Sequence, residues 1–393
     1  MITEAEARTK ILARVRSLPP RIVPIDRTLG CFAAHDMTAR LPLPLFDNSA
    51  MDGYAVIAES CRRGERLRVV GEQAAGVDRK LRVGNGEAVR VFTGAAMPEG
   101  ADAVVMQEDV TRDGAEIVVN TEVETGEFVR QRGCDLSEGQ KILEAGDRLR
   151  PQTQALLAAQ GFSDIEVGGE VRAAVVSTGD ELVRSGDALQ PGQIYESNST
   201  LLRGLLEECG VSVESSRHAA DRPEDLKAAL RAGIKHDALI VSGGVSVGDR
   251  DLVRPVLADL GAEIDVWRVS IKPGKPFLFG RAADCAIFGL PGNPVSAFVT
   301  FLLLVRPALL KLMGANDKAL HLPVALARLA VDVQNDGDRP HYIRGELRDG
   351  EFTPIGRQES HALFGMSRSN ALLCIAPGKK FSAGALVQVQ FWA

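Results

Sequence analysis

The sequence predicts a multidomain protein of the α/β plus β class, with a central doubly wound α/β domain, a β-rich second domain and a C-terminal β-barrel. Between residues 170 and 314, short apolar runs alternate with helical periodicity, which is typical of a mostly parallel sheet covered by helices. From Val56 to about Leu149 the pattern is strand-like with glycine turns, and beyond Gly314 short alternating segments indicate a small barrel or sandwich. A chain of 393 residues is long for one core and indicates two to four domains.

Composition and charge narrow the functional classes. The hydrophobic content of 45% and charged content of 25% are ordinary for a folded globular protein. The formal charge of -6, without a long basic run, argues against nucleic acid as a partner. Six cysteines occur singly with no C-x-x-C pair, which argues against a disulfide framework and a cysteine zinc site. We therefore expect a cytoplasmic protein.

The N-terminal residues predict a helix and not a targeting segment. Thr3 and Glu6 have the spacing of a capping box. The pattern lacks the basic and then apolar regions of a signal peptide. The longest apolar stretch, Phe298 to Val305, is too short to span a bilayer, so no membrane association is expected. The apolar residues expected on one face of the helix are Ala7, Ile11, Leu12 and Val15.

After Pro19-Pro20, an extended segment at 22–25 leads to an unusual run at 41–56. Prolines hold its first part extended, and N-S-A-M-D-G-Y-A-V follows from Asn48. Asp52 precedes Gly53, a pair that most often forms a simple turn. The close packing of Met, Asp and Tyr in the run leaves a functional interpretation open.

The β-rich region contains one hairpin signal and two polar spots. Asp113-Gly114 lies between the apolar runs 103–106 and 117–119, which predicts that these two runs pair as a hairpin. Thr93 follows Val91-Phe92 at a strand end, and the segment 130–135 places arginines beside Asp135. Read alone, each polar spot is more often structural than functional.

The remaining elements follow in order. A helix with proline at its start and glycine after its end is predicted at 151–161. Residues 315–319 are predicted to be a linker, Asp349-Gly350 a hairpin turn, and 386–392 a closing strand. The α/β region is predicted to contain strands at 171–176, 211–215, 238–241, 264–269, 277–279 and 286–288, and helices at 198–209, 223–232, 251–260 and 294–313.

The stretch from Asp237 to Asp251 is the strongest local signal. A buried strand ends in a glycine-rich turn and then opens a helix, which presents free N–H groups to an anion. Asp249 and Asp251 at the same turn would repel a bare anion, so a cation or a basic side chain is expected between them and the ligand. A plain strand-to-helix connection explains the glycines equally well. The stretch contains neither the Walker phosphate loop nor the dinucleotide fingerprint.

Polar segments follow five of the six predicted strands of the α/β region. Because ligands of open parallel sheets bind beyond the carboxyl ends of the strands, these segments are expected to meet at one edge. Hard oxygen ligands suit Mg²⁺, and lysines with loop N–H groups suit phosphate or another oxyanion. General acid–base catalysis by a carboxylate stays open, while a histidine zinc site and a G-x-S-x-G serine nucleophile find no support. The segments are Ser177 to Glu181, Ala220 to Arg222, Ser242 to Asp251, Ile271 to Pro276 and Leu290 to Ser296.

At these residues the chain resembles the molybdopterin molybdenumtransferases, the family of MoeA-like enzymes and the gephyrin E-domain, along essentially its whole length. Molybdopterin adenylyltransferases and CinA-like proteins share the α/β fold and its S-G-G-x-S loop, but not the whole set of motifs. The motifs are N-S-A-M-D-G-Y-A-V (48–56), F-T-G-A-A-M-P-E-G-A-D-A-V-V (92–105), S-T-G-D-E-L (177–182), S-G-G-V-S-V-G-D-R-D (242–251), I-K-P-G-K-P (271–276) and L-P-G-N-P-V-S (290–296).

The resemblance implies four domains, with an α/β domain of the molybdopterin-binding type, in an elongated homodimer. It implies that molybdenum from molybdate is inserted into adenylylated molybdopterin, with Mg²⁺ present and AMP released. It also implies a site between the α/β domain of one subunit and the β-rich domain of the other, with a molybdopterin adenylyltransferase and molybdoenzyme chaperones as protein partners. The expected domains are 1–45 with 146–169 (N-terminal, linking), 46–145 (β-rich), 170–314 (α/β) and 315–393 (C-terminal barrel).

The same resemblance implies roles for individual residues. Glu181, Asp221 and Asp251 would hold the metal or position water, joined as catalytic residues by Asp52 and Asp135 of the other subunit. Ser367, in the C-terminal domain, would contact an anion. The residues implied to bind pterin, phosphate or nucleotide are Thr93, Thr178, Gly179, Asp180, Ser242, Gly243, Gly244, Ser246, Gly248, Asp249, Lys272, Lys275, Pro291, Gly292, Pro294 and Ser367.

The chain departs from the family pattern at a few positions. Cys134 stands before Asp135 where relatives commonly carry an acidic residue, and Arg268 stands where many carry lysine, which changes hydrogen-bond geometry. The commonly seen G-S-H becomes Glu359-Ser360-His361. Two alternatives remain: a scaffold that kept the fold and lost catalysis, which has little need of clustered charge, and a related adenylyltransferase, which would lack the M-D-G-Y segment.

Overall fold

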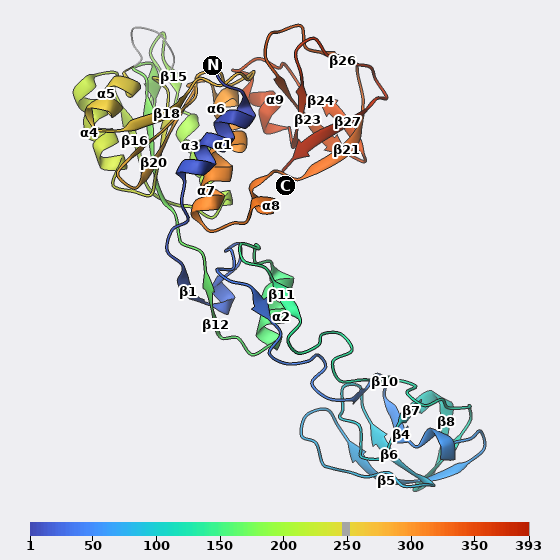
Figure 1. Ribbon diagram of the computed structural model, residues 1–393. Coiled ribbons are helices and arrows are strands. Elements are labelled where there is room, and N and C mark those ends of the chain that lie inside the picture. The colour runs from blue at the N-terminus through green and yellow to red at the C-terminus, as the bar shows by residue number, and fades with distance from the viewer. Residues whose placement is uncertain (246–251, 393) are drawn as a thin grey trace. The chain divides into compact units, whose positions relative to one another are not determined.

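The computed structural model describes residues 1–245 and 252–392, and these residues form two compact units (Figure 1). Unit 1 comprises Met1–His35 and Glu144–Ala393, and unit 2 comprises Asp36–Leu143. Unit 1 contains the α/β domain and the C-terminal barrel, and unit 2 consists of strands and short 3₁₀ turns. Together they confirm the predicted fold class.

The α/β domain is built on a six-stranded sheet in which five strands run parallel and only β19 runs antiparallel. The predicted mostly parallel sheet is therefore confirmed. Since five strands share one direction, their carboxyl ends lie at the same edge, which we call the rim. The strand order is β16 (Ser212–Ala219), β13 (Arg172–Thr178), β17 (Ala238–Ser242), β20 (Cys285–Leu290), β19 (Leu278–Ala282) and β18 (Glu263–Trp267).

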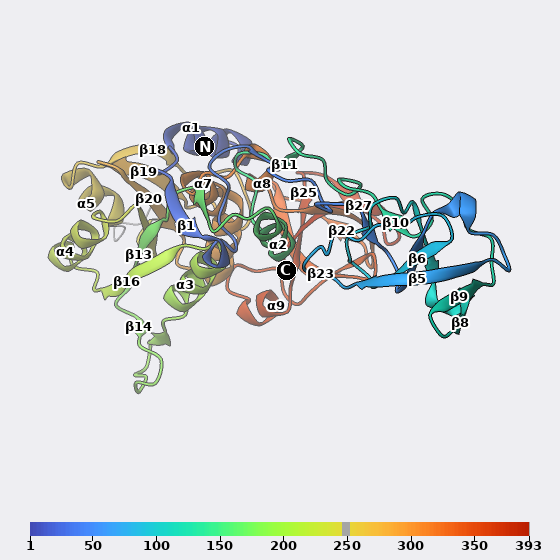
Figure 2. The same cartoon turned by 90° about the horizontal axis from the view of Figure 1, so that it is seen from below.

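Helices cover both faces of this sheet, as Figure 2 shows from below. Side-chain alternation assigns the faces: in β17, Ile240 packs with the first helix layer, whereas Leu239 and Val241 pack with the second. All three residues have no exposed surface. The first layer holds α1 (Glu4–Arg14), α3 (Asn198–Glu208), α6 (Pro294–Thr300) and α7 (Arg306–Leu312), and the second holds α4 (Pro223–Gly233) and α5 (Val253–Asp259).

α6 and α7 form one continuous helix, as the sequence predicts, with a π-helical turn at Phe301–Val305. Pro307 has no N–H to donate, and the chain widens into the π turn just before it. Within the described part of the chain, Pro294–Leu312 is the helix whose length and apolar composition would suffice to cross a membrane. Because 89% of its most apolar window is buried inside the protein, we interpret it as a core helix.

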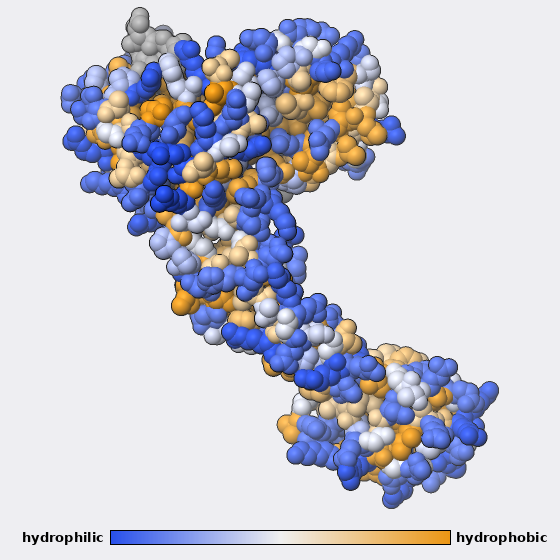
Figure 3. Space-filling view, viewed as in Figure 1, coloured by the Kyte–Doolittle hydropathy of each residue, from blue (hydrophilic) through white to orange (hydrophobic). Residues whose placement is uncertain are grey.

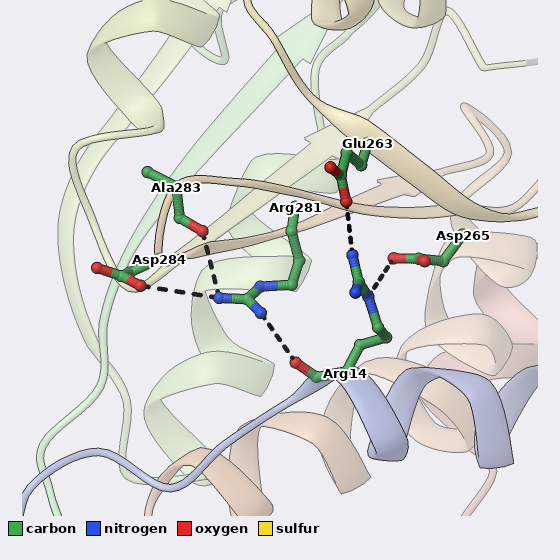
Figure 4. A network of polar contacts seen from close by, with 6 residues as sticks. All are labelled: Arg14, Glu263, Asp265, Arg281, Ala283 and Asp284. Carbon is green, nitrogen blue, oxygen red and sulfur yellow. Dashed lines mark hydrogen bonds and ion pairs between the residues drawn. The ribbon is translucent and has the colours of Figure 1, made fainter.

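The N-terminal helix α1 begins with the predicted capping box, in which Thr3 and Glu6 bond each other's backbone N–H groups. At its other end Arg14 donates to Glu263 and Asp265 on β18 (Figure 4). Arg281 of β19 donates to the carbonyl of Arg14, so α1 is fixed to the antiparallel edge of the sheet.

The predicted linker at 315–319 is wrong in part, because Asp317–Leu320 forms the short helix α8. Asn316 caps this helix by accepting from the N–H of Ala319. Gly146 packs so tightly here that a Cβ atom would lie 2.3 Å from the Asn316 nitrogen. A capping asparagine and a close backbone approach explain why this segment is ordered structure and not a connector.

The C-terminal domain is a closed five-stranded barrel. Asp349 and Gly350 both have positive φ and form the predicted turn between two of its strands. Figure 3 shows hydrophobic side chains on the visible face of the barrel. Val324, Leu326 and Leu386, on two of its paired strands, are exposed. The barrel comprises β21 (Val324–Leu329), β24 (Glu351–Pro354), β23 (His341–Arg348), β25 (Ala371–Ile375) and β27 (Leu386–Phe391), with the pair β22 (Val333–Gln334) and β26 (Lys380–Phe381) beside it.

His341, at the start of β23, is expected to make the stability of unit 1 depend on pH. It is 8% exposed, and burial, followed by the charges of Lys272, Arg344 and Arg339, lowers its pKa to about 4. Below about pH 6.5 the unfolded chain binds a proton that the folded protein rejects until about pH 4. The free energy of unfolding should therefore fall by about 3 kcal/mol as the pH drops through this window. Urea titrations at several pH values should show this slope in the wild type and a weaker one in His341→Gln.

Unit 2 contains a second six-stranded sheet. The predicted turn at Asp113-Gly114 is present, but the predicted pairing of its flanking runs is wrong. The hairpin joins 110–113 to 116–119, while 103–106 pairs with 53–56, a buried run about fifty residues earlier in the chain. The strand order is β7 (Ala103–Met106), β4 (Gly53–Val56), β6 (Glu87–Val91), β5 (Arg66–Gln73), β9 (Glu116–Val119) and β8 (Val110–Asp113).

Short elements complete both units. In unit 1, β1 (Arg21–Pro24) pairs with β12 (Asp164–Val167), and α2 (Pro151–Ala159) is the predicted proline-started helix. In unit 2, β2 (Met37–Thr38) pairs with β11 (Lys141–Leu143), and β3 (Asn48–Ser49) pairs with β10 (Val129–Arg130). Single 3₁₀ turns lie at Ile25–Arg27, Ala58–Ser60 and Gln107–Asp109.

Candidate active site

A cavity of about 600 Å³ lies at the rim of the α/β sheet. Segments after β13, β16, β17 and β20 line it, which is the edge where the sequence predicts a ligand. Its size is within the usual range of small-molecule sites. The residues that line it are Thr178, Gly179, Glu181, Leu182, Ile194, Tyr195, Glu196, Ser197, Asn198, Asp221, Ser242, Gly243, Gly244, Val245, Pro276, Pro291, Gly292, Asn293, Pro294, His361 and Leu363.

The ends of β13 and β16 are joined by hydrogen bonds between their polar residues. The Thr178 hydroxyl donates to Oδ1 of Asp221 over 2.5 Å, and the N–H of Asp221 donates to Oδ1 of Asp180 over 3.0 Å. Thr178 is buried, whereas Asp221 is half-buried and Asp180 is exposed. Three predicted site residues are thus held together, and Asp221 retains a carboxylate oxygen to bind a ligand.

Glu181 follows Gly179 and folds back over it. A Cβ atom at Gly179 would lie 2.7 Å from a Glu181 carboxylate oxygen, and the φ of Gly179 is +148°. Glycine at 179 therefore leaves room for the Glu181 carboxylate. Both Glu181 and Asp221 line the cavity, so two anionic oxygen donors face the same volume.

These carboxylates fit a magnesium ion bound together with substrate. Within residues 1–245 and 252–392, no group of three His, Cys, Asp or Glu side chains is arranged to hold a metal alone. Mg²⁺ in proteins is commonly bound by one or two carboxylates, substrate phosphates and waters, and Glu181 and Asp221 supply such a pair. Asp251, the third predicted ligand, lies outside the described residues.

The turn after β17 requires its two glycines. Gly243 has a φ of +93° and Gly244 one of +61°. A Cβ atom at Gly243 would lie 2.5 Å from the carbonyl oxygen of Thr178, and one at Gly244 would lie 2.8 Å from Val253. The two glycines therefore let the turn lie directly against β13 and α5, with its backbone beside the cavity. The predicted ligands Ser246, Gly248 and Asp249 lie outside the described residues.

Asn198, the first residue of α3, is a cavity residue that the sequence analysis missed. Its Nδ2 donates to Oγ of Ser242 over 2.8 Å and to the carbonyl of Gly292 over 2.7 Å. The Gly292 carbonyl can only accept, so it fixes the orientation of the amide. Among residues 1–245 and 252–392, the buried Oδ1 atom has no hydrogen-bond partner. A strand end, a helix start and the Pro291–Pro294 turn are thus joined at one side chain, which only tertiary structure can reveal.

The turn after β20 brings the C-terminal domain to the cavity. Asn293 donates to Oγ of Ser360, and the N–H of Val295 donates to the Ser360 carbonyl. These bonds place His361 and Leu363 in the cavity lining. The predicted contact Ser367 ends the short helix α9 (Leu363–Ser367), donates to the Phe364 carbonyl and does not line the cavity.

The predicted lysines lie beside the cavity and not in its lining. Lys272 and Lys275 are exposed on the segment that follows β18, and Pro276 of the same segment lines the cavity. The backbone of Lys272 pairs with β23 through bonds to Pro340 and Tyr342. Both ammonium groups are therefore on flexible stems next to the site.

In unit 2, two of the three predicted site residues contact each other. Oδ1 of Asp52 accepts from both the N–H and the hydroxyl of Thr93, each over 2.8 Å. The backbone bond, followed by the hydroxyl bond, lowers the pKa of Asp52, so this carboxylate stays ionised at neutral pH. Asp135 is exposed, and its backbone N–H donates to the Leu43 carbonyl.

Comparison with known proteins decides the family. The model of the MoeA N-terminal region (domains I and II) matches residues 2–161, that of a probable molybdopterin binding domain matches 174–311, and that of the MoeA C-terminal region (domain IV) matches 326–392. A molybdopterin molybdenumtransferase of Haemophilus influenzae is 35% identical over 404 residues, covering 99% of this chain and 98% of that protein. The chain belongs to the MoeA family.

Further relatives agree with this assignment. A molybdopterin molybdenumtransferase of Nostoc is 37% identical, covering 92% of this chain and 86% of that protein. A crystal structure of a MoeA protein from Pyrococcus horikoshii is similar with a TM-score of 0.85 at 29% identity, covering 100% of both chains. The resemblance found in the sequence motifs is therefore confirmed, and it extends over the whole MoeA chain.

Proposed function

We propose that this MoeA protein inserts molybdenum from molybdate into adenylylated molybdopterin and releases AMP. Its family places it among the transferases of molybdenum cofactor biosynthesis. The observation that carries the detailed proposal is the rim cavity, in which Glu181 and Asp221 share one volume with the Gly243–Gly244 turn. The glycine turn suits the phosphate groups of a substrate, and the two carboxylates suit a divalent cation bound with it.

In this proposal the chain binds and orients the adenylylated substrate. The backbone at Gly243 and Gly244 holds a phosphate, and Lys272 and Lys275 reach it or molybdate from the side. Thr178 orients the Asp221 carboxylate through its hydroxyl. Glu181 and Asp221 hold Mg²⁺, which neutralises phosphate charge when bound. With Asp251, they position the water that attacks the phosphoanhydride.

We further propose that Asp52 and Asp135 act on the same substrate from the other subunit of a homodimer. The ionised Asp52, held by two bonds from Thr93, supports a role in placing a cation or a water molecule. Mixed dimers provide the test. A preparation of Asp52→Ala and Glu181→Ala subunits, each inactive alone, should regain part of the wild-type turnover on mixing, whereas no recovery would contradict the proposal.

A second cavity in unit 1 supports the homodimer. It has a volume of about 680 Å³ and is lined mainly by apolar residues of α3, of the continuous helix Pro294–Leu312 and of the C-terminal domain, including Trp392. We expect a second copy of the chain to cover this surface, because exposed apolar hollows of this size mark interaction sites. A cytoplasmic location, the absence of membrane and nucleic-acid partners, and contacts with an adenylyltransferase and with chaperones stay predictions.

Gly204→Arg should weaken the dimer. Gly204 lies on α3 at this cavity, and a Cβ atom there would meet no atom of the described residues within 4 Å. The substitution therefore leaves the subunit fold intact while placing a charged side chain at the expected interface, and it should raise the dissociation constant at least about 100-fold. Sedimentation velocity over a concentration series measures this, with Gly204→Ala as the control. Equal dissociation constants for the wild type, Gly204→Arg and Gly204→Ala would exclude this cavity as part of the dimer interface.

The proposed reaction is tested by AMP release from adenylylated molybdopterin. AMP should appear only when both molybdate and Mg²⁺ are added to the purified protein. Binding of the substrate without AMP release under any condition would favour the scaffold alternative. Transfer of adenylate to molybdopterin from ATP would favour the adenylyltransferase alternative.

A further inference from the structure

One wall of the rim cavity is a small projecting flap, residues 182–196. Its base is the strand pair β14 (Leu182–Val183) and β15 (Ile194–Tyr195), and its tip is the loop 184–193. Figure 2 shows the flap extending away from the body of the α/β domain near β14. Leu182, Ile194 and Tyr195 all line the cavity, so the flap contributes an apolar wall to a site whose other residues are largely polar.

The flap exposes large apolar side chains that a surface loop closed by a short parallel strand pair has no structural need for. Ile194 is 56% exposed and Tyr195 is 47% exposed, although both lie on the strand nearest the cavity. Exposed aliphatic and aromatic side chains at a cavity gain stability by covering a ligand. In the Gly243 turn and the acidic pair, the site already has groups for phosphate and cation. The exposed apolar side chains of the flap suit the remaining part of such a substrate, an uncharged planar group.

Tyr195 is held in place before any ligand arrives. Its hydroxyl donates to the carbonyl of Asp187 in the flap loop over 3.1 Å. The strand pair is closed by bonds from Ile194 to Glu181 and from Glu196 to Val183. Glu196 in turn accepts from the N–H of Ser199 in the first turn of α3. The ring is therefore fixed to the flap loop through its hydroxyl, and the strand that carries it is joined to the start of α3 through Glu196. This lowers the entropy cost of packing a ligand against the ring.

We propose that the flap binds the planar heteroaromatic ring of the substrate, with Tyr195 as the stacking residue and Ile194 beside it. This inference rests on the proposed function and deepens it, because it assigns the ring-binding wall of the same site. Adenylylated molybdopterin contains two planar rings, adenine and pterin, which share the chemistry of a flat, polarisable face. Stacking on an aromatic side chain accepts any flat heteroaromatic ring, and its energy is large enough to determine the affinity of the site for a ligand with such a ring.

The test compares ligands with and without a ring. Binding of AMP, ribose 5-phosphate and pterin is measured by calorimetry with the wild type, Tyr195→Ala and Tyr195→Phe. Tyr195→Ala should lose about 10-fold or more of its affinity for AMP, for pterin or for both, and should keep its affinity for ribose 5-phosphate. Tyr195→Phe, which keeps the ring, should stay within about twofold of the wild type. Loss of AMP affinity alone assigns adenine to the flap, and loss of pterin affinity alone assigns pterin.

The matched control is Leu189→Ala. Leu189 is 43% exposed on the same flap but does not line the cavity, so its variant should bind all three probes like the wild type. Unchanged ring binding by Tyr195→Ala would overturn the inference while leaving the proposed function intact. An equal loss for ribose 5-phosphate would overturn it too, since the flap would then act by shaping the whole site. A wild-type protein that binds neither ring would contradict the inference and the proposed function together.

Discussion

Asp221→Asn is expected to lower the rate of AMP release at least about 100-fold while leaving the protein folded. The amide can still accept the Thr178 hydroxyl through its oxygen, and the backbone bond from Asp221 to Asp180 does not involve the altered atoms. What the substitution removes is one of the three carboxylate charges in the cavity lining, and with it a proposed ligand for Mg²⁺. Steady-state AMP release gives the rate, and thermal unfolding checks the fold.

Asp259→Asn is a matched control for this prediction. Asp259 forms an exposed ion pair with Lys227 away from the cavity, so its charge should contribute little to stability or turnover. Raising the Mg²⁺ concentration should partly restore the Asp221 variant, because a weakened metal site still fills at high concentration. Near wild-type turnover in Asp221→Asn would remove this residue from the mechanism.

Gly243→Ala is the second substitution with a large expected effect. Its φ of +93° disfavours any side chain, and the new Cβ atom would lie 2.5 Å from the Thr178 carbonyl. The turn must therefore move away from β13, which should cost on the order of 2 kcal/mol of stability. Substrate affinity should fall by about 100-fold or more, since the backbone N–H groups lose their position at the phosphate.

Gly292→Ala is the control for Gly243→Ala. It tests whether any methyl group added at the cavity has the same effect as the change in the conformation of the Gly243 turn. Gly292 also lines the cavity, but its added Cβ atom would make only an ordinary contact, 3.7 Å from the Cα of Gly243. This variant should keep its stability and most of its affinity, as measured by urea unfolding and by calorimetry with AMP. Equal stability and equal AMP affinity of the two alanine variants would show that substrate binding does not depend on the conformation of the Gly243 turn.

The period of the apolar residues was sufficient to predict the α/β domain. Strands buried on both faces gave continuous apolar runs such as Ala238 to Val241, and the polar segments after them meet at one rim because the strands are parallel. Strand partners in unit 2 were not predictable in this way. Residues 103–106 pair with 53–56, far away in sequence, and neither run carries a signal that names its partner.

Gly53 illustrates how a local interpretation can be incomplete. The sequence presented Asp52-Gly53 as either a simple turn or a functional pair. A Cβ atom at Gly53 would lie 2.0 Å from the carbonyl of Val105, so this glycine is required by strand packing. Asp52 instead binds Thr93, 41 residues away. The two neighbours thus have separate roles. Gly53 allows the strands to pack closely, and Asp52 is an ionised carboxylate held by Thr93.

Some residues of the site could not be predicted from the sequence, because contacts between residues far apart in the chain bring them to the cavity. Asn198 looked like an ordinary first residue of a helix, but its amide joins Ser242 to Gly292. His361 reaches the cavity because Ser360 is bonded to Asn293, 67 residues away. Ser177 to Glu181, in contrast, follows one strand directly, and adjacency in the chain was enough to find it.

The most direct test of the proposed reaction is the metal content of the pterin product. The wild-type protein is incubated with adenylylated molybdopterin, molybdate and Mg²⁺, and the released pterin is analysed by mass spectrometry beside the AMP formed. We expect one molybdenum in the pterin product for each AMP released, and neither product with Asp221→Asn. AMP without molybdenum in the pterin, or molybdenum in the pterin without AMP, would contradict the coupled reaction at the rim cavity.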